Sequence, residues 1–434
     1  MTSAIEKEKQ RIRKVTQLLY KGAKRVRILR SIDWPASVKQ GFFAKGAKEL
    51  PEISYPGFDA KPTIDIIREA RRMIIPISTI DLWLERQSIS IETGARMLAG
   101  TGTPVFFEYS RQVYGEPTDP LRFIPASPLD LAQSVQDVID KLARIDLGVA
   151  PSAHLTAEDV AKEIKAAAGQ HFGEDAPKVI LVDSLSANAL ATADRIRIRR
   201  DARFTDRDAA QLLNHEAYIH VATSLNGRFQ TDLPILGAGH PSTTRTQEGL
   251  AVFAEITSGT MELDRLRRLA DRVFAIQMAI EGADFLDVYG YFLERTGNPD
   301  QSFENARRVF RGGVITGGAP FTKDVVYLFG LLLVSSVIRA IFSAGRSDCL
   351  RLLFCGKLEA QDIPALCELA AMGLCKPARY LPPWASDLRS LLASLTYSTF
   401  MSKIDHAPMT AVVEKILENA PIVEFPVESN NPRA

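Results

Sequence analysis

Two histidines and a glutamate in "NHEAYIH", residues 214–220, have side chains that could bind a metal ion and move a proton. One common zinc-peptidase signature is His-Glu-x-x-His, in which histidines four residues apart share one face of a helix. Here His215 and His220 are five residues apart, and Glu216 follows the first directly. The question is whether a helix with one extra residue still lets both histidines reach one ion.

Helix geometry limits the answer to two alternatives. Successive residues turn by about 100°, so an i, i+4 pair is offset by about 40° and an i, i+5 pair by about 140°. A regular α-helix would therefore point His215 and His220 to different faces. A local π-type widening would absorb the extra residue and restore a shared face, and such widenings favour functional sites. The alternative is a chance pairing of two core histidines, since the chain has six in 434 residues.

A third ligand candidate follows in "TQEGLAVFAE", residues 246–255. Zinc in hydrolytic sites typically takes three protein ligands and keeps one position open. Glu248 begins a predicted helix over 245–259, and Gly249 has no Cβ, so a neighbouring helix could approach closely. Glu255 falls on the same helical face as Glu248 and could orient a ligand histidine. A solvated surface glutamate is the simpler interpretation of Glu255.

Two strands and a helix are expected to position the motif. "KVILVD", 178–183, is an apolar run typical of a buried strand, whereas "RIRIRR", 195–200, alternates as a half-exposed strand does. Its arginines favour an edge strand, because charge there discourages aggregation. "TDRDAAQLLNHEAYIHVATSL" then predicts a helix of about twenty residues, in which Thr205 and Asp208 resemble a capping box.

The remaining sequence predicts many helices and a small mixed sheet, which is an α+β fold. We expect a basic N-terminal helix or arm over 1–60, with a helix at 5–30 and a loop at 31–62. A helical subdomain is expected over 61–150, and the catalytic domain over 151–434. The stretch 148–159 is a candidate boundary before a helix capped by Thr156, and the chain after about 260 is mostly helical.

Composition excludes few classes of protein. The net charge is +1, but residues 1–50 carry 13 basic and four acidic side chains. This basic segment predicts a solvated helix face or a flexible arm, with a patch for an acidic partner or nucleic acid as the alternative.

The four cysteines lack Cys-x-x-Cys spacing and favour buried free thiols over a second metal site. "YLFGLLLVSSVI", 327–338, is too short to span a bilayer and predicts a buried core helix. The N-terminus lacks the apolar region of a secretory signal. We therefore expect a cytoplasmic protein without a membrane partner, and nucleic acid is not an expected partner.

The combined motifs resemble the QEGLA-motif family. The resemblance rests on His-Glu-x-x-x-His, on "QEGLA", and on "LSANALATADRIRIRRDARFT", "FRGGVITGGAPFTKDVVYL" and "GARMLAGTGTPVFFEYSRQVYGEP", and it spans most of residues 60–430. Bacterial members are named flavohemoglobin expression-modulating QEGLA motif proteins. Animal relatives are the microtubule-associated tyrosine carboxypeptidases, which remove the C-terminal tyrosine of α-tubulin.

The resemblance implies a zinc metallopeptidase with one zinc ion per chain. His215, His220 and Glu248 would be the ligands, and Glu216 would be the general base. The fold would then be a mostly helical, gluzincin-like domain, with the edge strand of the sheet bordering the active-site cleft. The bacterial name implies a regulatory association rather than a reaction.

Hydrolysis also requires cations and hydrogen-bond donors near the metal. An anionic tetrahedral intermediate needs a donor, and "FTKDVVY" offers Lys323 and Tyr327, four residues apart on one face if helical. A carboxypeptidase needs a cation for the terminal carboxylate of its substrate, for which Arg311 and Lys323 are candidates. Arg245, His240 and the strand at 195–200 are further candidates for lining a groove for an acidic peptide.

The leading expectation is a cytoplasmic metallocarboxypeptidase that acts on the extended C-terminal tail of a peptide or protein, bound by strand addition near 195–200. One alternative is a regulatory or binding protein that affects gene expression. Another is a zinc amide hydrolase that acts on a small molecule or a cell-wall peptide. The substrate, the choice between exo- and endopeptidase, and the oligomeric state do not follow from the sequence.

Overall fold

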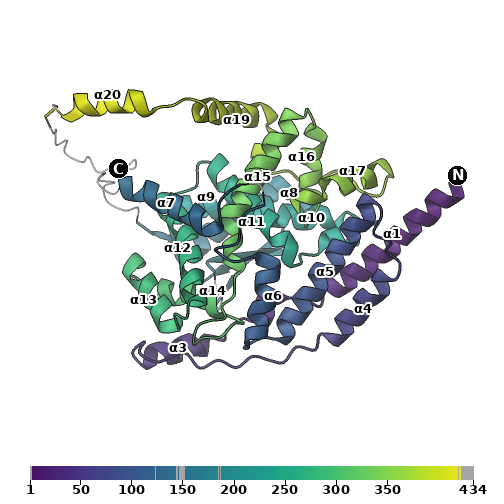
Figure 1. The fold of residues 1–434 in the computed structure, drawn as a ribbon, viewed down its shortest axis with the longest axis horizontal. Helices are drawn as coiled ribbons and strands as arrows, with labels where there is room; N and C mark the ends of the chain where they lie inside the picture. The colour runs from purple at the N-terminus through teal and green to yellow at the C-terminus, as the bar shows by residue number, and fades with distance from the viewer. Residues whose placement is uncertain are drawn as a thin grey trace.

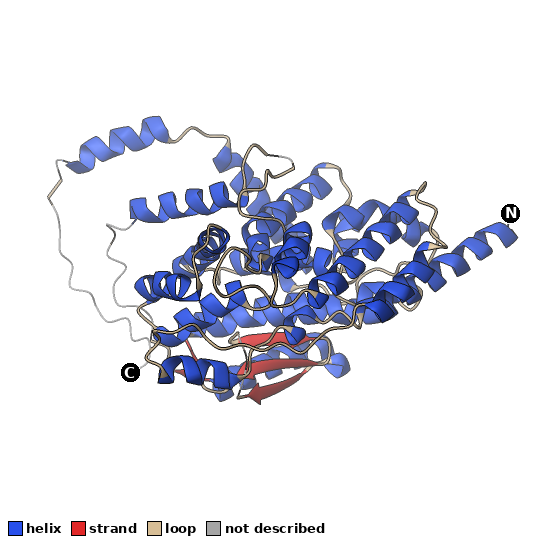
Figure 2. Ribbon diagram, turned by 60° about the horizontal axis from the view of Figure 1, so that its bottom comes forward, coloured by secondary structure: helices blue, strands red, loops and turns tan. Residues whose placement is uncertain are grey.

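The computed structural model describes residues 2–421 except 123, 143–144, 146–151, 184, 186 and 419. Most of these residues are helical, and the few strands lie together at one side of the helical body (Figure 1, Figure 2). The expected α+β class is therefore confirmed. One hydrophobic core joins Ile12, Ile67 and Leu250, which come from all three expected parts of the chain. The division at residues 60 and 150 remains a prediction, and the second boundary lies outside the described residues.

The N-terminal part of the fold is a group of helices. These are α1 (Thr2–Ala23), α2 (Ile28–Ser31), α3 (Ala36–Ala44), α4 (Lys61–Arg71), α5 (Thr79–Ala99), α6 (Pro104–Tyr114) and α7 (Pro128–Leu142). The basic segment is an ordered amphipathic helix, because α1 buries Ile12, Val15 and Leu19 against the core and keeps Lys7 and Lys14 exposed. The arm is thus part of the packed body.

The expected loop over 31–62 is wrong in part, because it contains α3. Phe42 of this helix is 1% exposed and packs edge-on against Phe285 and Tyr289. These partners lie more than 240 residues further along the chain. Tertiary contact between aromatic rings therefore stabilises a helix that the local Pro and Gly pattern did not predict.

The sheet region follows α7. Its elements are β1 (Leu155–Thr156), α8 (Ala157–Phe172), the 3₁₀ turn η1 (Gly173–Asp175), β2 (Lys178–Val182), β3 (Ala189–Thr192), β4 (Arg195–Arg199) and β5 (Arg203–Phe204). The three longer strands form a mixed sheet in the order β2-β4-β3, with β2 parallel and β3 antiparallel to β4. The other two form a separate antiparallel pair. Thr156 caps α8 with a capping box, as expected.

The expectation that 195–200 is an edge strand is wrong. β4 is the central strand, and β3 and β2 are the edges. Ile196 and Ile198 are fully buried on one face, while Arg197 and Arg199 lie half-buried on the other. The alternation correctly predicted two different faces, but a face pattern does not show how many neighbours a strand pairs with.

The helix that contains the histidine motif and the helix that contains Glu248 come next. They comprise α9 (Asp206–Leu212), the π-helix η2 (Leu213–Val221), α10 (Ala222–Arg228), the 3₁₀ turns η3 (Pro234–Gly237) and η4 (Pro241–Thr243), and α11 (Thr244–Thr257). Thr205 and Asp208 form the predicted capping box at the start of α9. The edge strand β3 lies alongside η2, and α11 packs against η2 from another direction.

The C-terminal part is helical, as expected. It comprises α12 (Leu263–Ile280), α13 (Phe285–Thr296), α14 (Pro299–Phe310), the 3₁₀ turn η5 (Lys323–Val325), α15 (Val326–Ser343), α16 (Ser347–Leu353), the 3₁₀ turn η6 (Ala360–Asp362), α17 (Ile363–Ala371), α18 (Pro383–Ser386), α19 (Leu388–Ser402) and α20 (Ala407–Glu418). Figure 1 shows α20 extending away from the helical body.

Helix α15 contains the most apolar stretch and is longer than that stretch suggested. Lys323–Ser343 has a mean hydropathy of 2.3 and passes a length and composition test for a membrane span, which core helices also pass. The α15 residues Val334 and Ile338 are fully buried in the main core. A Cβ on Gly249 of α11 would lie 2.2 Å from the carbonyl oxygen of Gly330 in α15. The close helix approach expected at Gly249 is therefore confirmed, and α15 is the neighbouring helix.

Candidate metal centre

The π-helix brings the two histidines of the motif to one side. The amide of Ala222 donates to the carbonyl of Ala217, five residues earlier, as π-helical bonding requires. The ring centroids of His215 and His220 are 4.9 Å apart with an interplanar angle of 77°. The widening predicted from the five-residue spacing is confirmed, and the regular helix with rings on opposite faces is ruled out.

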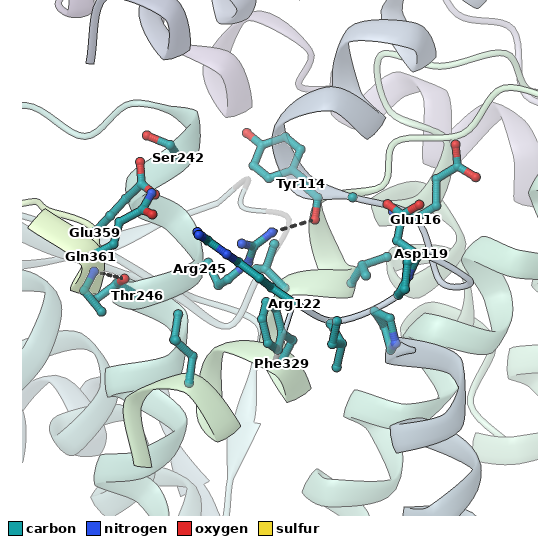
Figure 3. A pocket seen from close by; sticks show the side chains of 18 residues that line it. Tyr114, Glu116, Asp119, Arg122, Ser242, Arg245, Thr246, Phe329, Glu359 and Gln361 are labelled. Carbon is teal, nitrogen blue, oxygen red and sulfur yellow. Dashed lines mark hydrogen bonds between the residues drawn. The ribbon is translucent and has the colours of Figure 1, made fainter. Parts of the chain in front are cut away.

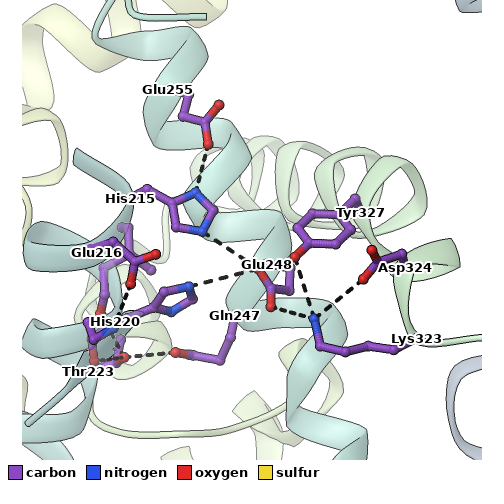
Figure 4. A network of polar contacts seen from close by, with 12 residues as sticks. His215, Glu216, His220, Thr223, Gln247, Glu248, Glu255, Lys323, Asp324 and Tyr327 are labelled. Carbon is purple, nitrogen blue, oxygen red and sulfur yellow. Dashed lines mark hydrogen bonds and ion pairs between the residues drawn. The ribbon is translucent and has the colours of Figure 1, made fainter. Parts of the chain in front are cut away.

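Glu248 of α11 completes a set of three donor side chains. Its Oε2 lies 3.7 Å from Nε2 of His215 and 3.8 Å from Nε2 of His220. The three donor atoms lie within 4.8 Å of one another (Figure 4). Helix η2 supplies both imidazoles and α11 supplies the carboxylate, so the packing of these two helices creates the site.

This donor set fits a zinc ion. Zinc binds imidazole nitrogen at about 2.0–2.1 Å and carboxylate oxygen at similar distances, so the donors of a tetrahedral site are roughly 3.4 Å apart. The two distances to Glu248 are within a few tenths of an ångström of that spacing. Two imidazole nitrogens and one carboxylate oxygen are also the kinds of ligand that hydrolytic zinc sites use.

Glu255 holds His215 in the orientation that a metal ligand needs. Its Oε1 lies 2.7 Å from Nδ1 of His215, which leaves Nε2 directed toward Glu248. Glu255 is fully buried and also accepts hydrogen bonds from Arg265 and Gln211. The interpretation of Glu255 as a solvated surface residue is therefore wrong. Burial would raise the pKa of Glu255, but Arg265 and His215 lower it below its usual range.

The charges around the two histidines differ. Burial would lower the pKa of His215, but Glu248 and Glu255 raise it to about 10. Burial and the neighbouring His215 hold the pKa of His220 well below its usual range. Glu248 and Glu255 therefore favour one positive charge beside His215, where the three candidate ligands meet.

Glu216 lies between the donor set and the free edge of the sheet. Its side chain is buried, and its Oε2 accepts a hydrogen bond of 2.9 Å from the amide of Ala191 in β3. Burial raises the pKa of Glu216, although the nearby His215 opposes the effect. A carboxylate with a raised pKa is suited to accept and return a proton, and this one adjoins the candidate ligand His215.

Lys323 and Tyr327 adjoin Glu248, and their side chains lie on one face of the η5–α15 segment. Nζ of Lys323 is 2.9 Å from Oε1 of Glu248 and 3.4 Å from the hydroxyl of Tyr327. Arg308 donates to the same hydroxyl at 3.2 Å and to Asp324 at 2.6 Å. Burial would lower the pKa of Lys323, but Glu248 raises it, so the ammonium stays charged. Sequence reasoning assigned no role to Arg308 or to Asp324, although Asp324 directly follows Lys323.

Lys357 is a further residue to which the sequence reasoning assigned no role. Its Nζ lies 3.2 Å from the carbonyl oxygen of His220, 3.0 Å from Oγ1 of Thr223 and 2.7 Å from Oε1 of Gln247. A π-helix leaves some carbonyls poorly bonded, and this lysine supplies a donor to one of them. Burial lowers the pKa of Lys357 to about 8. Its only sequence signal was a lysine within an apolar stretch, "FCGKLEA".

The other predicted substrate-binding residues lie in different surroundings. Arg311 is 3% exposed and lies over the ring of Phe321. Arg245 begins α11 one turn before Glu248, but its guanidinium lies over the ring of Phe329. His240 is buried, with Nδ1 3.0 Å from Oγ of Ser90, so it is a core residue.

All four cysteines are free thiols, as expected. Cys349, Cys355 and Cys375 are buried, and Cys367 is half-buried. Sγ of Cys349 lies 3.7 Å from Sγ of Cys367, and Asp348 is close enough to form a second possible donor group with them. Asp348 is exposed and already paired with Arg346, so this group is a weaker metal candidate than the first.

A mostly helical α+β protein with a buried His-His-Glu donor set is the structural class that these observations define. The family profile described as microtubule-associated tyrosine carboxypeptidase matches residues 40–403 of the chain. The chain belongs to this family, which confirms the suspected relationship. Membership implies a carboxypeptidase-type enzyme that acts on a protein tail. No curated protein sequence matches the chain.

Proposed function

We propose that the chain is a zinc-dependent carboxypeptidase with one zinc ion held by His215, His220 and Glu248. The observation that carries this proposal is the π-helix, which places two histidines five residues apart beside the same carboxylate. Such a helix is rare and costs backbone hydrogen bonding, so its position at this motif favours a functional role. Zinc bound there would act as a Lewis acid toward water and the scissile carbonyl.

The residues of the chain would carry the proton transfer. Glu216 would accept the proton of the attacking water at its carboxylate and pass it to the leaving amine. Burial supports this role, because it raises the pKa of Glu216 toward the range of a proton carrier. Lys323 and Tyr327 would donate to the oxygen that becomes negative during the attack. Their positions beside Glu248 support that assignment.

The substrate tail would pair with the free edge of β3. Within the described part of the chain, the strand order β2-β4-β3 leaves the outer side of β3 without a strand partner. The amide of Ala191 points from that side to Glu216, so an extended peptide on this edge would lie next to the proposed base. This edge replaces the strand at 195–200, which is central. We keep Lys323 and Arg311 as candidates for the terminal carboxylate, in a region that also contains Arg308.

The substrate class would be the C-terminal tail of a peptide or protein, in a cytoplasmic setting. The family description names a tyrosine carboxypeptidase associated with microtubules. The cations near Glu248 would favour a tail rich in acidic residues. Lys323 is buried, and Arg272 and Arg308 are half-buried. An acidic peptide that ends in tyrosine is therefore the first substrate to test.

The test combines metal analysis of the purified full chain with mass spectrometry of a C-terminal peptide library. The proposal expects one zinc per chain and the loss of a single C-terminal residue from acidic tails. Zinc without any cleavage would favour a binding or regulatory protein. Internal cleavage would favour an endopeptidase, and cleavage of small amides alone would favour a different amide hydrolase. The exposed Arg351→Gln variant serves as a folding and activity control.

A further inference from the structure

A cavity of about 310 Å³ lies beside the start of α11 and is lined by the half-buried side chains of Arg245 and Glu359 (Figure 3). Its walls come from η4 and α11, from α15, from the segment after α6 and from the segment around Glu359. None of His215, Glu216, His220, Glu248 or Lys323 lines it. The cavity is therefore distinct from the candidate metal centre.

Arg245 and Arg122 are the cations that line this cavity, and no described carboxylate forms an ion pair with Arg245. The Nε atom of Arg245 is buried without a hydrogen-bond partner among the described residues. One terminal nitrogen reaches the carbonyl oxygen of Tyr114 at a long 3.5 Å, and the guanidinium lies 4.8 Å from the centre of the Phe329 ring. A buried guanidinium normally forms paired, two-pronged hydrogen bonds to a carboxylate or phosphate. An anionic group on a ligand would supply that partner.

Glu359 is the matching anion in the same cavity. Its Oε2 accepts a hydrogen bond of 2.7 Å from Gln361, and no cation lies within 4.0 Å of it among the described residues. Arg245 and Glu359 thus carry opposite charges in one cavity without forming an ion pair with each other. Two unpaired, separated charges are complementary to a ligand that carries both charges itself.

The side of the cavity toward α15 is apolar, while Glu116, Asp119 and Arg122 line it elsewhere. Leu121, Val326, Phe329 and Leu333 line the cavity between the charged groups and the body of α15. Apolar walls with a few fixed polar groups are typical of small-molecule sites, and about 310 Å³ lies at the small end of their range. The ligand therefore needs an apolar or aromatic group next to its two charges.

From this arrangement we infer that the cavity binds a free α-amino acid with an apolar or aromatic side chain. Its carboxylate pairs with Arg245, its ammonium group faces Glu359, and its side chain contacts Phe329 and Leu333. The assignment requires no hydrolytic activity, so it stands or falls separately from the proposed carboxypeptidase. Amino acid bound here would occupy the N-terminal end of the helix that carries Glu248.

The test is calorimetric titration of the full chain with L-phenylalanine, L-tyrosine and L-leucine. Matched probes are L-phenylalaninamide, which lacks the carboxylate, 3-phenylpropanoate, which lacks the ammonium, and L-aspartate, which lacks the apolar group. We expect saturable binding of the three amino acids. The affinity for each matched probe should be lower by about tenfold or more. Arg245→Gln and Glu359→Gln should lower the affinity for L-phenylalanine to a similar extent. The control variants Arg351→Gln and Glu368→Gln, at exposed residues, should leave this affinity unchanged.

Two further variants keep the test decisive if a buried substitution disturbs folding. Leu333→Trp should fill the half-buried wall and abolish binding without removing a charge. The His215→Ala/His220→Ala double variant should retain binding, because neither histidine lines the cavity. No binding of any amino acid at about 10 mM, equal binding of the matched probes, or loss of binding only in the double histidine variant would overturn the inference.

Discussion

Oε1 of Glu255 and Nδ1 of His215 are 2.7 Å apart, and both side chains are buried. This contact joins the end of α11, which carries Glu248, to the first histidine of the π-helix. It fixes which imidazole nitrogen faces Glu248, because the other nitrogen is held by Glu255. Glu255 therefore acts on the candidate metal through His215.

Replacing the carboxylate of Glu255 should lower the affinity of the site for zinc. We expect Glu255→Gln to lower zinc affinity by roughly 10–100-fold, as loss of the group that orients a ligand histidine generally does. Competition with a zinc chelator measures the change. The exposed Glu294→Gln variant is the control, and it should bind zinc as the parent chain does. Equal affinity in the two variants would contradict the orienting role.

The proposed base gives a kinetic prediction. Glu216→Gln keeps nearly the same shape but removes the proton acceptor, so kcat should fall by about 10²–10⁴-fold with zinc content unchanged. Peptide cleavage and metal analysis on the same preparation check both statements. Unchanged turnover would show that another group takes the proton.

Lys357 should support the π-helix through the carbonyl of His220. Lys357→Met keeps the length of the side chain but removes the donor from His220, Thr223 and Gln247. The hydroxyls of Ser224 and Thr223 still donate to His220 and Gln247, so loss of the lysine's hydrogen bonds should cost about 0.5–1.5 kcal/mol of the free energy of unfolding. Zinc affinity should fall because the position of His220 is less fixed. Chemical denaturation and chelator competition measure these effects. Lys376→Met, at an exposed lysine, should change neither quantity.

The approach of α11 and α15 should depend on Gly249. A Cβ there would lie 2.2 Å from the carbonyl oxygen of Gly330, so the helices must separate in Gly249→Ala. We expect a loss of about 1–3 kcal/mol in the free energy of unfolding and weaker zinc binding, because Glu248 is the adjacent residue. Gly290→Ala in α13 is the matched control, since its Cβ would have open space. If Gly290→Ala is destabilised as well, the loss of stability in Gly249→Ala would be a general effect of replacing glycine in a helix.

His240 gives a prediction for the pH dependence of stability. Burial lowers the pKa of His240 to about 3 from an ordinary value of 6.5. Between these pH values the unfolded chain binds a proton that the folded chain does not, so stability should fall as the pH decreases from 6.5 to 3. One such group contributes a slope of up to about 1.4 kcal/mol per pH unit. Urea unfolding of His240→Gln across this range should show a shallower slope, and an identical slope would exclude this residue as the cause.

The sequence by itself determined the local features of this protein. The spacing of His215 and His220 required a widened helix for any shared ion, because a residue turns by about 100° whatever its neighbours are. The capping boxes at Thr156 and Thr205 followed from side chains three residues apart. Gly249 marked a close helix contact, because no other residue lacks a Cβ. Each of these relations depends on a few consecutive residues.

Only the tertiary structure decided the relations between distant segments. It made 195–199 the central strand and 189–192 the edge, because pairing depends on strands elsewhere in the chain. It also buried Glu255 against His215 and brought Lys357 to the carbonyl of His220, 137 residues away in sequence. Arg245 and Glu248 lie one turn apart on α11, yet Arg245 lines the cavity and Glu248 adjoins the two histidines. Side chains one turn apart share a helix face, so the elements packed around α11 decide what each of them contacts.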